Sequence, residues 1–234
     1  VRLSRAAAAA LEFLVAILPH LRPQRFVLER SHEPPVILYS DGCHEDETMD
    51  VGFIVGRPKP EAYDTAAAFR TVDMYEWHHG GASIPADLRA AFLERKQQIG
   101  QVEIIGGIIP YLSVPELLVG SRVIHFIDNT SAIAALAKGY SNMPDSARLV
   151  HTFHAWQAGA MCDVWFEYVP SKANPADEPS REPRLWQGEF APAPRVASRP
   201  RCVVFPPLTS VDNARAWQRD AEIVCDARGA ARGG

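Results

Sequence analysis

Residues 123–136 read VIHFIDNTSAIAAL, a stretch that predicts a strand followed directly by a helix. The run up to residue 127 is typical of a buried strand, and it ends at Asp128. Asn129 and the residues after it are suited to begin a helix. Because sites in open α/β sheets form at the carboxyl ends of strands, the pattern indicates a functional role for Asp128. Taken alone, the pair Asp128-Asn129 is more often a simple helix cap.

Composition limits the class of protein. The chain has 234 residues, of which 47% are hydrophobic and 22% charged, as in ordinary globular proteins. The net charge of −4 gives no overall attraction for nucleic acid, so a polyanion would be met by a local patch or through metal ions. The apolar segment 6–18 is interrupted by Glu12 and is too short to span a membrane, so we expect no membrane contact.

The cysteines indicate the compartment. Four are present, they lie far apart, and they contain no C-x-x-C pair, so neither a zinc site nor a disulfide scaffold is expected. We therefore expect an intracellular protein, cytoplasmic or nuclear, that is not secreted.

The order of the predicted elements gives the fold class. Strands are expected over 36–42, 51–55 and 66–77, with no room for helices between them, so they should form an antiparallel meander. The pair His78-His79 falls in the loop after them and lacks a third ligand for a metal. A short helix then begins at Ser83 or Pro85. Further helices are expected at 97–112, 129–138 and 143–160, a strand at 162–169, and a loop at 170–177 that opens a last short helix.

Acidic residues recur at the ends or beginnings of these elements. Asp41 closes the first strand, Glu103 lies early in the first long helix, and Asp177 opens the last helix. Together with Asp128 they make four acids in similar settings. Four acids from separate elements could converge on one site, which a cap at each position would not explain.

This order and these acids resemble the ribonuclease H domain of retroelement reverse transcriptases of the LTR or DIRS type. The motifs that carry the resemblance are YSDG at 39–42, QIGQVE at 98–103, FIDNTSA at 126–132 and NPADEPSR at 174–181. The resemblance covers residues 36–181. It implies an α/β ribonuclease H-like fold, in which a mixed five-stranded sheet of three antiparallel and then two parallel strands is flanked by helices.

The resemblance also implies an activity and its site. Asp41, Glu103, Asp128 and Asp177 would be the catalytic, metal-binding carboxylates, with Asp41 bridging two Mg²⁺ ions or, alternatively, Mn²⁺. The substrate would be an RNA–DNA hybrid, whose RNA strand is cut to leave a 3′-hydroxyl and a 5′-phosphate. The residues expected to bind that substrate are Gly42, Gln101, Asn129, Thr130 and Asn174. Lys138, Arg148, Lys172 and Arg181 are candidates for contacts with phosphates.

Physical chemistry supports such a set without reference to the family. Hydrolysis of a phosphodiester needs an activated water and stabilisation of charge on the attacking and leaving oxygens, and two divalent ions about 4 Å apart supply both. Mg²⁺ prefers carboxylate oxygens. Without metal, the same acids would repel one another and take up protons, so the site should weaken at acid pH.

The chain departs from the cellular family at one point, because residues 170–176 contain no histidine. This departure puts a histidine-assisted product release in doubt. The pair Gly106-Gly107 is unusual inside a helix and predicts close packing against the sheet. Two alternatives stay open: a catalytically inactive hybrid-binding or spacer module of a decayed element, and a transposase or integrase of related fold.

The domain organisation follows from the extent of this resemblance and from the composition of the chain on either side of it. Residues 1–30 form a helical lead-in, expected to be the end of an upstream polymerase or connection region, and 31–35 form a linker. The ribonuclease H-like domain occupies 36–182. Residues 183–234 are rich in proline, alanine and arginine and are expected to be a largely disordered extension, with 211–226 as a further candidate helix.

Overall fold

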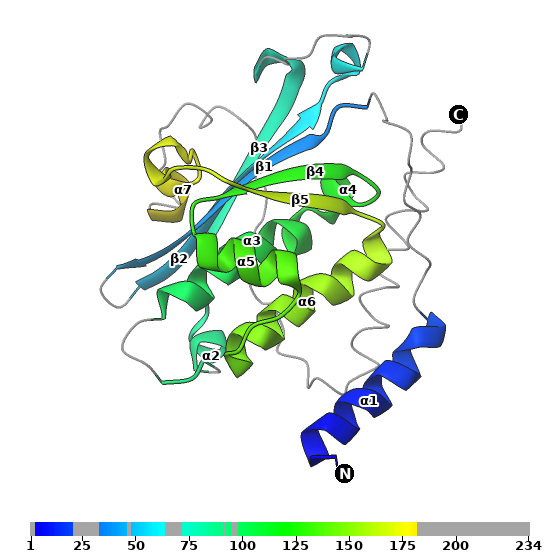
Figure 1. Ribbon diagram of the computed structural model, residues 1–234. Helices are drawn as coiled ribbons and strands as arrows, with labels where there is room; N and C mark the ends of the chain where they lie inside the picture. The colour runs from blue at the N-terminus through cyan, green and yellow to red at the C-terminus, as the bar shows by residue number, and fades with distance from the viewer. Residues whose placement is uncertain are drawn as a thin grey trace.

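The computed structural model describes residues 3–20, 33–45, 48–63, 72–90, 92–94 and 98–181, and a mixed sheet lies at its centre. The order across the sheet is β3-β2-β1-β4-β5 (Figure 1). The pairs β1–β2 and β2–β3 are antiparallel, and β1–β4 and β4–β5 are parallel. The predicted mixed sheet, with three antiparallel strands followed by two parallel strands, is therefore confirmed. The strands are β1 Val36–Glu45, β2 Thr48–Pro58, β3 Tyr75–Ser83, β4 Arg122–Ile127 and β5 Asp163–Tyr168.

The antiparallel half is longer than predicted. Strand β1 continues past the predicted end at residue 42 to Glu45, because Cys43, His44 and Glu45 also pair with β2. The predicted loop at His78-His79 is wrong, since these residues lie inside β3 and pair with Val55 and Ile54. Ladder pairing to a neighbouring strand overrides the weak strand preference of histidine and glycine. Of the strand expected over 66–77, the part at 66–71 lies outside the described residues.

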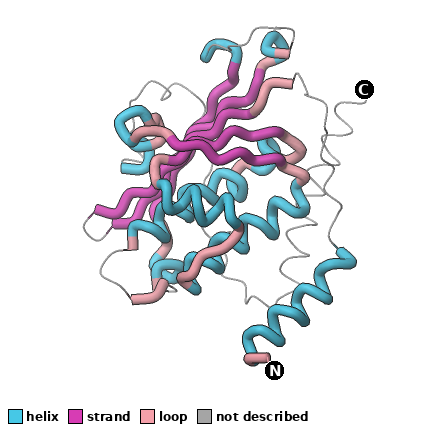
Figure 2. The backbone as a smooth tube through the Cα atoms, in the orientation of Figure 1, coloured by secondary structure: helices cyan, strands magenta, loops and turns pink. Residues whose placement is uncertain are grey.

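Long helices cover one face of the sheet (Figure 2). They are α3 Ile99–Ser113, α5 Thr130–Lys138 and α6 Pro144–Ala160, close to their predicted bounds. Leu38 of β1, Ile105 of α3 and Phe153 of α6 are each 0% exposed, and they belong to one core between the helices and the sheet. Burial of such side chains is the dominant stabilising contribution to the fold. Helix α5 ends at Gly139, whose φ of 75° is the left-handed conformation that glycine adopts without strain.

The short helix α7 Asp177–Arg181 packs against β1 and β2. A Cβ on Gly52 would lie 2.4 Å from the backbone nitrogen of Ser180, so α7 sits directly on a strand that carries no side chain there. A Cβ on Gly42 would instead meet the backbone of α3. Gly52 pairs with Asp41, next to Gly42. Because neighbours along a strand face opposite sides, α3 and α7 cover opposite faces of the sheet.

The remaining elements are short or peripheral. Helix α1 Arg5–Ile17 begins at the N-cap Ser4, whose side chain accepts a hydrogen bond from the Ala7 N–H, and it lies apart from the sheet (Figure 1). The helix expected after Pro85 is α2 Ala86–Arg89, and α4 Pro115–Leu118 was not predicted. The 3₁₀ turns are Leu18–His20, Pro60–Ala62, Val72–Met74 and Ser171–Ala173.

Several predictions about the ends of the chain are not tested. The extension at 183–234, its candidate helix and the segment 21–32 lie outside the described residues, so the proposed domain boundaries stay predictions. Cys43 and Cys162 are buried free thiols, while Cys202 and Cys225 are not described. In the part of the chain that the structure describes, no helix is both long and apolar enough to cross a bilayer.

Candidate metal centre

Asp41 lies within β1 and is 5% exposed. Its carboxylate accepts a hydrogen bond from the Ser180 hydroxyl of α7. The pKa of Asp41 is raised to about 6, mainly by burial and additionally by repulsion from Asp128 and Asp177, while the Ser180 hydrogen bond and Arg181 lower it. The ionised form of Asp41 is therefore unfavourable when no cation is bound beside it.

Glu103 reaches Asp41 because α3 touches β1 at two glycines. A Cβ on Gly42 would lie 2.7 Å from the backbone nitrogen of Glu103, and a Cβ on Gly106 would lie 2.7 Å from the carbonyl oxygen of Asp41. A separation below 3.0 Å is not sustained by real side chains, so each position needs glycine. The close packing predicted from Gly106-Gly107 is confirmed, and it brings the Glu103 carboxylate to the strand that carries Asp41.

Glu103 is 8% exposed, and its ionised form is strongly disfavoured. Burial, followed by repulsion from Asp41 and Asp128, raises its pKa to about 8. Hydrogen bonds from the side chain of Asn129 and the backbone of Gly42 partly offset this shift. At neutral pH a proton therefore occupies this carboxyl group unless a cation replaces it.

Asp128 completes the cluster at the end of β4, where the sequence predicted it. Each of Asp41, Glu103 and Asp128 offers a carboxylate oxygen, and these oxygens lie within 4.8 Å of one another. Among the described residues, Glu103 Oε2 and Asp128 Oδ1 are buried oxygens without a hydrogen-bond partner. Buried polar atoms are normally paired, and oxygen ligands are those that hard divalent cations prefer. The cluster therefore has the chemistry to hold a metal ion.

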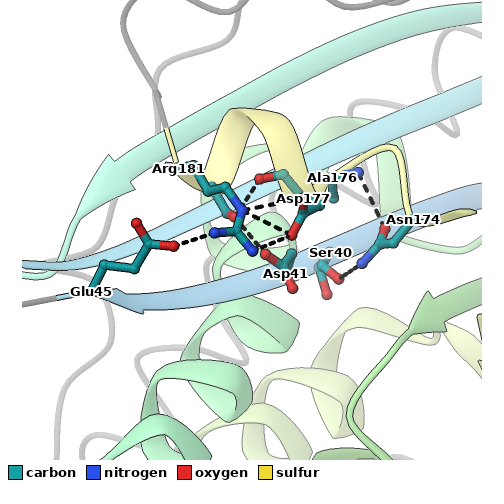
Figure 3. Close-up of polar contacts among 8 residues, drawn as sticks. Ser40, Asp41, Glu45, Asn174, Ala176, Asp177 and Arg181 are labelled. Atoms are coloured by element: carbon teal, nitrogen blue, oxygen red, sulfur yellow. Dashed lines mark hydrogen bonds and ion pairs between the residues drawn. The ribbon is translucent and has the colours of Figure 1, made fainter. Parts of the chain in front are cut away.

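Asp177, the fourth predicted acid, lines the same pocket but is already paired. Its two oxygens accept hydrogen bonds of 3.0 to 3.2 Å from the guanidinium of Arg181, one turn later on α7. Arg181 also pairs with Glu45 of β1 (Figure 3). The hydrogen bonds to Asp177 raise the pKa of Arg181, which keeps the guanidinium charged. The structure thus gathers three acids and places the fourth beside them in an ion pair.

The pocket between these elements has a volume of about 250 Å³. It is open to solvent on one side, and polar groups dominate its wall. Gly42, one of the residues expected to bind substrate, forms part of this wall. The residues that line the pocket include Asp41, Glu103, Asp128, Ser171, Asp177 and Arg181.

Two residues expected to bind substrate lie in the interior instead. Gln101 is 2% exposed, and its amide donates to Ser146 Oγ at 3.0 Å, so it does not face a groove. Asn174 is 5% exposed, donates to the carbonyl of Ser40 and accepts from the Ala176 N–H (Figure 3). Both amides join segments of the protein. The side of its element that a polar residue faces depends on tertiary packing, which the sequence motif does not show.

Asn129 and Thr130 begin α5 at the edge of the site. The Asn129 Oδ1 accepts hydrogen bonds of 3.0 Å from the Ser131 and Ala132 N–H groups, so this residue is the helix cap that the sequence also allowed. Its amide additionally donates to Glu103. Thr130 is the first residue of α5 and is exposed. Asn129 is therefore tied to the acid cluster, whereas substrate contact by Thr130 stays a prediction.

Sequence reasoning missed the hydroxyl of Ser180 and the carboxylate of Glu45. Ser180 belongs to the quoted NPADEPSR motif, but only the tertiary structure shows that it donates to Asp41. No local pattern marks Glu45, which contacts Arg181 across 136 residues of sequence. Of the cations expected to meet phosphates, Arg181 lines the pocket, and Lys138, Arg148 and Lys172 are exposed.

No family model matches the chain, and no curated protein matches it. Among solved structures, the chain is similar to a crystal structure of LC9-RNase H1, described as a type 1 RNase H with the type 2 active-site motif. The sequences are 12% identical, the TM-score is 0.42, and the match covers 80% of this chain and 86% of that one. The sheet order and acid cluster described above stand on the geometry of this chain, independently of that similarity.

Proposed function

We propose that this chain is an RNA–DNA hybrid endoribonuclease that hydrolyses the RNA strand with divalent metal ions, Mg²⁺ or Mn²⁺. One observation carries the proposal: three carboxylates from three different elements meet within 4.8 Å, and two of their buried oxygens have no hydrogen-bond partner among the described residues. A protein gains nothing in stability from such mutual repulsion, so the arrangement points to a bound cation.

Each acid has a role in this proposal. Asp41, on the central strand, would be a ligand common to both ions, and Glu103 and Asp128 would each help to hold one of them. Bound divalent ions in such a site activate water and offset the charge that develops on phosphate oxygens. Asn129 steadies Glu103 through its hydrogen bond, and Ser180 does the same for Asp41.

Arg181 gives the rim of the pocket its positive charge. It is half exposed, with its guanidinium lying against Asp177 and Glu45. We propose that Asp177 turns from Arg181 toward the metal site when the site is loaded, which leaves the guanidinium to meet a phosphate of the substrate. Lys172 follows Ser171 on the same rim and is exposed. These local cations compensate for the net charge of −4 when a polyanion approaches.

The wider setting is part of the proposal. The motifs of the sequence resemble those of retroelement polyproteins, so we propose that a reverse transcriptase domain acts with this one inside the cell and that the cut follows DNA synthesis. A second candidate is a catalytically inactive hybrid-binding module. The observation that favours it is the ion pair that engages Asp177 and leaves three acids for metal.

A cleavage assay tests the proposal. The full chain is incubated with a labelled RNA–DNA duplex with and without Mg²⁺, beside single-stranded RNA and duplex DNA. We expect cleavage of the hybrid RNA only, dependent on the metal. Hybrid binding without cleavage at any Mg²⁺ or Mn²⁺ concentration would support the inactive module, and cleavage of duplex DNA would support a transposase-like enzyme.

A further inference from the structure

A second set of polar residues lies in the apolar core, away from the pocket. Ser40, Tyr111 and His125 are each 0% exposed. Ser40 Oγ lies 2.8 Å from His125 Nε2, and Tyr111 Oη lies 3.0 Å from His125 Nδ1. The imidazole thus bridges two hydroxyl groups within a core that contains Leu38, Ile127 and Phe153.

The three residues lie on the three elements that carry the acid cluster. Ser40 precedes Asp41 on β1, His125 precedes Asp128 by three residues on β4, and Tyr111 follows Glu103 on α3. The separation of Glu103 and Tyr111 is eight residues, or about 12 Å of helix at the usual rise. The network therefore connects, from within the core, the same elements whose outer ends form the pocket.

Helix α3 needs a contact that fixes its position against the sheet. Between Glu103 and Tyr111 it contains Gly106, Gly107 and Pro110. Glycine weakens a helix through its backbone freedom, and proline cannot donate the hydrogen bond to the preceding turn. The position of Glu103 is consequently poorly fixed by helix propensity, and the contact of Tyr111 with His125 ties the far end of the helix to the sheet.

The chemistry of the network makes its geometry specific. Burial lowers the pKa of His125 to about 3, so the imidazole is neutral and has one donor and one acceptor nitrogen. Both nitrogens are engaged, one by each hydroxyl. A buried polar group that loses its partner is strongly disfavoured, so small shifts of β1, β4 or α3 are resisted. Apolar side chains would fill the same space without this directional constraint.

We infer that Ser40, His125 and Tyr111 are positioning residues that set the spacing of Asp41, Glu103 and Asp128 for metal ions. The inference rests on the proposed function. It predicts that breaking the network loosens the acid cluster without removing a ligand. The site should then bind metal more weakly in a protein that is still folded.

The test uses the full chain with Tyr111→Phe, Ser40→Ala and the double variant. Tyr111→Phe keeps the ring that packs on Phe153 and Trp156 at 5.0 and 5.1 Å and removes the hydroxyl alone. The control is Thr152→Val, which removes another fully buried hydroxyl, on α6, an element without a cluster acid. Mn²⁺ affinity is measured by calorimetry at a temperature where thermal unfolding shows every variant to be folded.

We expect each single variant to bind Mn²⁺ about 10-fold more weakly, the lower end of the effect of residues that support metal ligands. The double variant should be little weaker than the weaker single variant, because either change already breaks the network. Thr152→Val should lose thermal stability and keep its Mn²⁺ affinity. Hybrid cleavage by the single variants should recover at high metal concentration, as a loss of affinity requires.

Other outcomes would overturn the inference. Unchanged Mn²⁺ affinity in folded Tyr111→Phe and Ser40→Ala would reduce the network to a structural role. Multiplied losses in the double variant would show two independent contacts. If the wild-type chain binds Mn²⁺ without cutting the hybrid, the proposed nuclease activity is contradicted, and the Mn²⁺ affinities of the variants still test the positioning role. If the wild-type chain binds no Mn²⁺, the proposed function and the positioning role are both overturned.

Discussion

The two sides of the pocket differ in how their charges are balanced. On the inner side, Asp41, Glu103 and Asp128 are close together, and no cation is paired with Glu103 or Asp128 among the described residues. On the outer side, the half-exposed Arg181 balances Asp177 and Glu45. The inner side is costly to the metal-free protein, whereas on the outer side one guanidinium offsets part of the charge of two carboxylates. This difference indicates that the inner side is adapted to a cation.

The largest expected effect comes from removing an inner ligand. Asp128→Asn should reduce metal-dependent cleavage by more than about 100-fold, since residues that only support a metal ligand already cost 10 to 100-fold. Folding should be preserved because the change relieves repulsion. Cleavage assays and thermal unfolding measure the two effects. Asp163→Asn, an exposed acid on the neighbouring strand, is the matched control and should behave as wild type. Cleavage retained by Asp128→Asn would remove Asp128 from the site.

The next effect concerns the contact that brings the inner acids together. Gly106→Ala would place a Cβ 2.7 Å from the Asp41 carbonyl oxygen, so α3 has to move away from β1. We expect a loss of about 1–3 kcal/mol in the free energy of unfolding, as for other overpacked sites.

Gly100→Ala on the same helix provides the control for that change. A Cβ at Gly100 has no atom within 4 Å, so this substitution should stabilise the protein by up to about 1 kcal/mol through helix propensity. Urea unfolding compares the two variants. Equal effects would mean that the helix does not depend on contact with the strand.

The pH dependence of metal binding tests the inner side of the pocket without a mutation. The pKa values of Asp41 and Glu103 are raised to about 6 and about 8, so protons compete with metal below these values. Mn²⁺ affinity should increase from pH 6 to pH 8, by up to about 10-fold per pH unit for each proton released.

The stability of the metal-free protein should change in the opposite direction. Because these two pKa values lie above those of the unfolded chain, their contribution is greatest in acid and is lost as the pH rises through 8. Thermal unfolding across this range, with and without Mn²⁺, measures both trends. An affinity that does not change with pH would contradict the buried, repelling cluster.

The smallest effect is expected at the rim. Arg181→Gln should alter the free energy of unfolding by no more than about 1 kcal/mol, because exposed ion pairs contribute little. It should raise the KM for hybrid and reduce the salt dependence of binding, and leave kcat within a few-fold. Arg5→Gln, at an exposed arginine of α1 that does not line the pocket, is the control. A loss of kcat as large as that of Asp128→Asn would show that Arg181 belongs to the inner side.

The sequence predicted the parts of this structure that depend on local pattern. The strand ending at Asp128 and the helix after it were foreseen because apolar runs and helix caps are local signals. The extension of β1 beyond Gly42 to Glu45 was not, because it depends on pairing with β2, which no local pattern encodes. The burial of Gln101 and Asn174 and the pairing of Asp177 with Arg181 likewise depend on contacts between distant segments.

The packing of α7 on Gly52 has a consequence for the synthesis of the protein. Asp41 comes from the first strand of the sheet, but the hydroxyl and the acid that flank it, from Ser180 and Asp177, come from the last described helix. A nascent chain still lacking α7 outside the ribosome can pair its strands, yet its pocket has no outer wall. The order of translation thereby delays completion of the acidic pocket until α7 has been made.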